Sequence, residues 1–70
     1  MERPTKQYGI YHWDTFEEGP EATTLVGEAD TLSEACAFTA THYKLDENGA
    51  DVIEIVNRDS RNVILRFKIG

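Results

Sequence analysis

The stretch TLSEACAFTATHYK, residues 31–44, carries the clearest secondary-structure signal in the chain. Thr31, followed three residues later by Glu34, fits a capping box, in which side chains satisfy the free N–H groups of a first helical turn. At about 100° per residue, one broad arc collects the residues that we expect to face a core. These are Leu32, Ala35, Cys36, Phe38, Thr39, Ala40, His42 and Tyr43. The pattern predicts one amphipathic helix over residues 32–44.

The segment after the helix changes to a period of two. DENG, residues 46–49, ends the helix and turns the chain, with Gly49 free to adopt a positive φ. DVIEIVN, residues 51–57, and NVILRFKIG, residues 62–70, then read as two strands around the turn RDSR. In the last strand Val63, Leu65, Phe67 and Ile69 share one face, and Ile64, Arg66 and Lys68 share the other.

The segment before the helix predicts a second pair of strands. Residues 7–14 are rich in Tyr, Trp and Ile, as strands are, and ATTLVGEA, residues 22–29, reads as their antiparallel partner. EEGPE, residues 17–21, is the turn between them. Gly27 weakens the end of the second strand and is a candidate position for a bulge.

The predicted order of elements is β-β-α-β-β, which defines the fold class as α+β. The economical arrangement is a four-stranded antiparallel sheet with the single helix packed on one face. Residues 1–6 read as a flexible tail and residues 7–70 as a single small domain. A chain of 70 residues buries only about 60% of its unfolded surface, so its stability margin is thin.

Both faces of the first strand carry aromatic residues. Alternation places Tyr8, Ile10 and His12 on one face and Tyr11 and Trp13 on the other, and the sequence leaves open which face is buried. In either case exposed aromatic rings lie beside the cations of the last strand, a combination common in protein interfaces. The candidate interaction surface therefore comprises Tyr8, Ile10, Tyr11, His12, Trp13, Ile64, Arg66 and Lys68.

The net charge of −6 disfavours direct binding to nucleic acid or to an anionic membrane. The charge is uneven, because residues 14–54 hold eleven acids against Lys44, a net of −10. Residues 55–70 hold four cations against Asp59, a net of +3. The acidic segment has two interpretations: a solvated surface, or a face for a basic partner.

No residue pattern predicts catalysis, a cofactor or a metal. Cys36, the only cysteine, lies on the apolar arc of the helix and should behave as a small hydrophobe. It is six residues from His42 and 24 from His12, spacings that fit no short zinc motif. No stretch of the chain matches the motif of a known family.

The sequence thus favours a small acidic, non-enzymatic protein-interaction or regulatory module that binds a protein partner or forms a homodimer. One alternative is an acidic mimic that blocks a basic, nucleic-acid-binding site on a partner. Another is a small ligand-binding protein or enzyme that uses His12, Cys36 or His42. A lone cysteine, a polar N-terminus and the absence of a long apolar stretch predict a cytoplasmic protein without membrane association.

Overall fold

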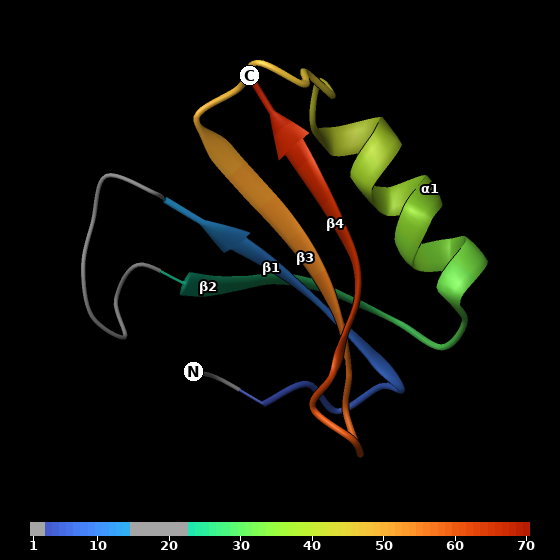
Figure 1. Cartoon of the computed structure of the whole chain (residues 1–70). Coiled ribbons are helices and arrows are strands. Elements are labelled where there is room, and N and C mark those ends of the chain that lie inside the picture. Colours follow the sequence, from blue (N-terminus) through green and yellow to red (C-terminus); the bar gives the residue numbers. More distant parts are fainter. Residues whose placement is uncertain (1–2, 15–22) are drawn as a thin grey trace.

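A computed structural model describes residues 3–14 and 23–70 and contains four strands and one helix in that part of the chain. The elements are β1 (Tyr8–Trp13), β2 (Thr23–Ala29), α1 (Leu32–His42), β3 (Asp51–Asn57) and β4 (Val63–Ile69). The strands form one antiparallel sheet in the order β2-β1-β3-β4, with α1 against one face (Figure 1). This confirms the predicted α+β fold. The turn predicted at residues 17–21 lies outside the described residues.

The helix begins where its capping residue predicts. Thr31 has an extended backbone, and its hydroxyl oxygen accepts a hydrogen bond from the Glu34 N–H at 3.1 Å. Regular helix ends at His42, two residues earlier than predicted, because Tyr43 returns to an extended conformation. The Tyr43 N–H still donates to the Thr39 carbonyl oxygen, so the last turn is closed.

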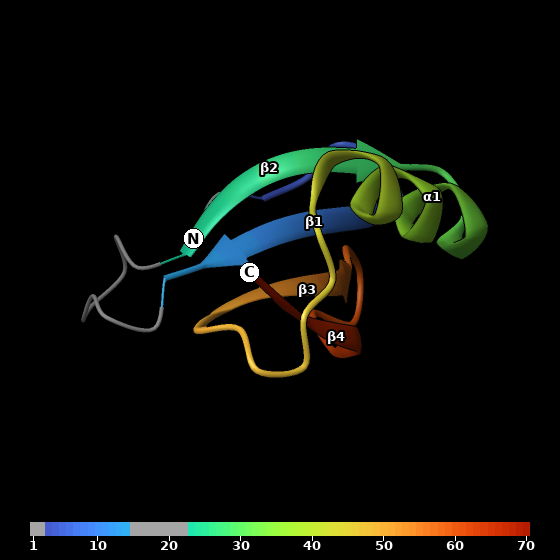
Figure 2. The ribbon, with the colours of Figure 1, turned by 90° about the horizontal axis from the view of Figure 1, so that it is seen from above.

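The main core lies between α1 and the sheet, and the helix contacts β1 and β2. Its fully buried members are Ile10, Ile53, Ile55 and Ala35. Figure 2 shows the strongly twisted sheet with α1 over its β2 side, and the molecule measures only 16 Å along its thinnest axis. Because the described residues contain one helix, the other face of the sheet has no helix over it.

The orientation of β1 answers the question that the sequence left open. Ile10 is fully buried in the main core, and Tyr8 packs against the same cluster. Because side chains alternate along a strand, Tyr11 and Trp13 lie on the face that points away from α1. Strand β1 lies between β2 and β3 in the sheet. One of its faces is in the main core, and the other points away from α1.

A register shift in β2 supports the predicted bulge near Gly27. Ile10 pairs with Gly27 but Tyr11 pairs with Leu25, which leaves Val26 as the additional residue. Val26 packs against the main core. Since paired residues share a face, Leu25 joins Tyr11 on the side away from the helix.

A second register shift, in β4, overturns one sequence prediction. Ile55 pairs with Leu65, whereas Val56 pairs with Val63, so Ile64 is the additional residue. Val63 therefore shares a face with Val56, on the side away from α1, and 47% of it is exposed. The prediction that Val63 shares a face with Leu65 is wrong, because strict alternation ignores the bulge.

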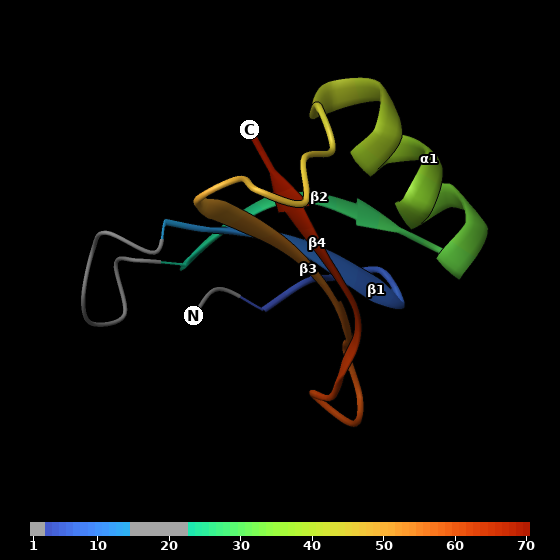
Figure 3. The same ribbon diagram turned by 45° about the horizontal axis from the view of Figure 1, so that its top comes forward.

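Gly49 does not use its freedom to adopt a positive φ, whereas Arg61, in the β3–β4 turn, has a φ of 60°. Gly49 is required for a different reason: a Cβ atom there would collide with the carbonyl oxygen of Ile69. The β3–β4 turn at residues 58–61 is confirmed, and the Asn57 side-chain oxygen accepts from the N–H groups of Asp59 and Ser60. In Figure 3 this turn projects beyond the sheet, away from α1.

Candidate functional site

The sheet surface that points away from α1 is here named the open face. Pairing and alternation assign its members in the described part of the chain. Its side chains are Tyr11, Trp13, Thr23, Leu25, Glu28, Val52, Glu54, Val56, Val63, Ile64, Arg66 and Lys68. Ile64 and Val63 are among the most exposed large apolar side chains described, at 41% and 47%. The open face thus combines aromatic, apolar and charged groups.

An ion pair lies at the centre of the open face. Arg66 donates from Nε and Nη2 to one carboxylate oxygen of Glu54, at 2.9 and 2.5 Å. The Glu54 side chain is only 11% exposed, whereas that of Arg66 is 56% exposed. The Arg66 guanidinium also lies over the Trp13 ring, 5.6 Å from its centroid. These contacts bury the acid beneath its partner and leave the cation at the surface.

The N-terminal segment, residues 3–6, covers one end of the open face. Pro4 is buried, and a Cβ atom on Gly9 would lie 2.9 Å from the proline ring and 2.8 Å from the Tyr11 ring. Gly9 therefore allows Pro4 to pack closely on β1. This cover explains why Tyr11 is only 2% exposed although no helix lies over it.

Two charged side chains hold the N-terminal segment in position. Glu28 accepts hydrogen bonds from the Thr5 and Lys6 backbone N–H groups and from the Thr5 hydroxyl. The Thr5 and Lys6 amides hold the pKa of the Glu28 carboxyl below its ordinary value, because they stabilise the ionised form. On the other side, Arg58 donates to the Thr5 carbonyl oxygen at 2.7 Å. The flexibility expected of residues 1–6 stays a prediction.

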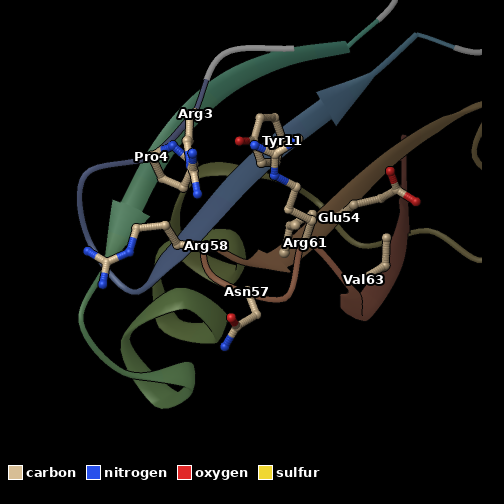
Figure 4. A pocket seen from close by; sticks show the side chains of 9 residues that line it. Arg3, Pro4, Tyr11, Glu54, Asn57, Arg58, Arg61 and Val63 are labelled. Atoms are coloured by element: carbon tan, nitrogen blue, oxygen red, sulfur yellow. The ribbon is translucent and has the colours of Figure 1, made fainter.

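A pocket of about 230 Å³ opens between the N-terminal segment and the β3–β4 turn (Figure 4). It is lined by Arg3, Pro4, Tyr11, Glu54, Val56, Asn57, Arg58, Arg61 and Val63. Arg58 also donates to Asp59 at 3.1 Å. That contact, a Gln7 hydrogen bond and the nearby Arg3 charge lower the pKa of Asp59. Three arginines, Arg3, Arg58 and Arg61, thus gather at the end of the open face beside the turn.

The structure separates the predicted interaction surface into two sets. Trp13, Ile64, Arg66 and Lys68 lie together on the open face, and Tyr11 shares that face but is buried. Tyr8, Ile10 and His12 lie on the side of α1, and Ile10 belongs to the main core. Four of the eight residues thus remain available for contact as one exposed or half-buried group.

The three residues considered for catalysis have different partners in the structure. His12 Nε2 lies 3.1 Å from an Asp51 carboxylate oxygen, and the His12 ring stacks with Tyr43 at 6.2 Å. His42 is exposed and makes an edge contact with Phe38 at 4.2 Å. Cys36 is a free thiol, half-buried against the main core. Each of the three side chains thus has a packing or pairing contact in the structure.

Residues 3–14 and 23–70 contain no group of three or more His, Cys, Asp or Glu side chains arranged to hold a metal ion. Within the same ranges, no helix is long and apolar enough to span a membrane. The chain matches no protein-family model, and the searches of curated proteins and of solved structures also find no match. The functional argument consequently depends on the geometry of the open face.

Sequence reasoning missed the residues that line the pocket from the N-terminal segment and the turn. Arg3 and Pro4 fall in the predicted tail, and Arg61 falls in a predicted turn, where cations are ordinarily solvated. The uneven charge was the available signal, since the C-terminal sixteen residues carry a net of +3. It indicated a basic strip but not the proximity of Arg3.

Proposed function

We propose that the protein is a small non-enzymatic binding module whose open face docks an acidic segment of a partner protein. The observation that supports this most strongly is the group formed by Trp13, Ile64, Arg66 and Lys68. Aromatic rings and arginine supply much of the affinity in protein interfaces, and an apolar neighbour adds buried area. Cations beside them favour a partner of opposite charge.

The charges of the open face favour an acidic partner because its own acids are already engaged. Glu54 is covered by Arg66, and Glu28 accepts from the N-terminal segment. Arg66 and Lys68, by contrast, are exposed. A partner therefore meets two cations on this surface although the whole chain has a net charge of −6.

A homodimer built from two open faces is less favourable on the same grounds. Face-to-face pairing would bring the Arg66 and Lys68 side chains of both copies into one interface, where like charges repel. A nucleic acid would meet the same cations, but the acidic remainder of the chain would repel its phosphates. A short acidic peptide lacks the like-charged cations of a second copy and contacts less of the acidic remainder than a longer nucleic acid would.

The test uses a capped ten-residue peptide with glutamate at alternate positions and one central leucine. Its affinity is measured by calorimetry at low salt for the unmodified protein, for Lys68→Glu and for Lys44→Glu. Both substitutions make the same charge change at exposed lysines, but Lys44 follows α1 and lies outside the open face. We expect Lys68→Glu to weaken binding about tenfold and Lys44→Glu to weaken it less than threefold.

Equal effects of the two substitutions would contradict the proposal, because they would indicate attraction to net charge alone. A peptide with lysine in place of glutamate should not bind, and its binding would favour the acidic-mimic alternative. Sedimentation of the free protein as a dimer would favour self-association instead.

A further inference from the structure

The pocket between the N-terminal segment and the β3–β4 turn lies at one end of the open face and is richer in arginine than the rest of that face. Three arginines line it, Arg3, Arg58 and Arg61, with one acid, Glu54. The lining therefore carries a net charge of +2, which leaves −8 for the rest of a chain whose total is −6. Such a concentration of guanidinium groups in an acidic protein is typical of a binding site for an oxyanion.

Two of these arginines are held less tightly than Arg58, although the Arg3 charge acts on Asp59 at longer range. The Arg58 side chain bonds to Thr5 and Asp59, but the side chains of Arg3 and Arg61 make no hydrogen bond or ion pair in the ranges 3–14 and 23–70. Figure 4 shows Arg61 extending from the turn toward Tyr11, with Arg3 entering from the N-terminal segment. Both guanidinium groups are available to a ligand.

The backbone of Arg61 provides independent support. Its φ of 60° lies in the left-handed region, which is unfavourable for a residue with a Cβ atom and easy for glycine. Glycine would therefore be the more stable choice at this point of the turn. Backbone strain of this kind concentrates at functional sites. A binding role for the Arg61 side chain in the pocket would explain why this position holds arginine and not glycine.

One part of the pocket wall is apolar. Pro4, Val56 and Val63 contribute hydrocarbon surface, and Val63 reaches this position through the β4 bulge. A bare inorganic anion would leave that wall in contact with water. At about 230 Å³ the pocket is smaller than the range of about 300–1,000 Å³ common for drug-sized ligands. Its ligand should be a small molecule or a single residue.

We propose that this pocket binds a carboxylate joined to a short branched apolar group. Arg3 and Arg61 hold the carboxylate by charge-assisted hydrogen bonds, and the apolar group lies against Pro4, Val56 and Val63. Two sources supply this chemistry, a free branched carboxylic acid and the C-terminal residue of a peptide. The proposal does not rest on the proposed function: the pocket shares Val56 and Val63 with the open face, but it is not lined by Trp13, Ile64, Arg66 or Lys68.

The experiment follows backbone amide shifts of the labelled full chain by NMR as a probe is added. Four probes are compared: 4-methylpentanoate, its neutral amide, N-acetyl-leucine and inorganic phosphate. We expect both carboxylates to bind with Kd on the order of 1 mM, with the largest shifts at Val56, Arg61 and Val63. The amide and the phosphate should each bind at least about tenfold more weakly. The tighter of the two carboxylates identifies the source.

The Arg61→Gly variant distinguishes a loss of binding from a loss of stability. Because glycine relieves the positive φ, this variant should raise Tm by about 4 °C while it weakens carboxylate binding about tenfold. Lys44→Gln removes one positive charge elsewhere and should leave the carboxylate Kd unchanged within about twofold. The proposal is overturned if acid and amide bind equally, if phosphate binds as well as the acids, or if Arg61→Gly retains full affinity.

Discussion

The two faces of one sheet in this protein are closed by different means. The face toward α1 is filled by aliphatic side chains such as Ile10, Ile53 and Ile55, each fully buried. The open face is closed only at one end, by Pro4 over Tyr11, and its centre holds an ion pair, Arg66 with Glu54. Apolar packing explains the residues found on the first face. The second face keeps exposed side chains, such as Ile64, that do not fill a core.

The largest contrast between the faces should appear when the same side chain is truncated on each. Ile53→Ala leaves a cavity in the main core and should lower the free energy of unfolding by about 3 kcal/mol. Ile64→Ala, on the open face at 41% exposure, should cost less than about 1 kcal/mol. Urea denaturation of both variants measures the difference. Equal losses would mean that the open face is a second core.

The ion pair of the open face should give the next largest effect. Arg66→Ala leaves the nearly buried Glu54 carboxylate without its partner and should cost about 2 kcal/mol. Lys68→Ala, which removes a cation with no bonded partner in the described residues, should cost less than about 0.5 kcal/mol.

A double-mutant cycle completes that test. The variant with both Arg66→Ala and Glu54→Ala should lose less stability than the two single losses added together, because no buried charge is then left unpaired. Strict additivity, measured by the same denaturation experiment, would show that the two side chains do not interact in solution.

Displacing the N-terminal segment that covers Tyr11 should cost less stability than breaking the ion pair. Gly9→Ala introduces a Cβ atom against Pro4 and Tyr11, so the N-terminal segment must move, at a cost of about 1 kcal/mol. Hydrogen exchange should then accelerate at the Thr5 and Lys6 amides, which donate to Glu28. Unchanged exchange at these two amides would contradict the packing described for Pro4.

The smallest expected effect is the loss, at low pH, of the hydrogen bonds between Glu28 and the N-terminal segment. The pKa of Glu28 is lowered from 4.5 in the folded protein, so its anchoring of the N-terminal segment is fully present above about pH 4.5. The anchoring is lost as the pH falls through the folded pKa, when the carboxylate gains a proton. The Thr5 and Lys6 amide shifts should titrate together with the Glu28 carboxyl below pH 4.5. A Glu28 carboxyl that titrates at or above 4.5 would contradict the contact.

The sequence predicts the elements well because local signals set them. The Thr31 cap, the alternation in residues 51–57 and the turn at 58–61 each depend on neighbours within a few positions. The buried face of β1 was not predictable in this way, since both of its faces are aromatic. The structure decides it through the packing of Ile10 against residues distant in sequence.

The site was harder to predict than the fold for the same physical reason. Each bulge changes which residues share a face, and alternation alone places Val63 on the wrong side. The pocket depends on contacts between Arg58 and Thr5, 53 residues apart, and no periodicity reports such a contact. Strain at Arg61 is likewise a property of the folded turn.

The central claim is that binding occurs on the open face while the face toward α1 serves folding. Amide and indole shift mapping with the glutamate-leucine peptide tests it most directly. The account predicts that the largest shifts fall on Trp13, Ile64, Arg66 and Lys68, with little change along α1. Shifts concentrated on α1, or no shift on the open face at millimolar peptide, would contradict it.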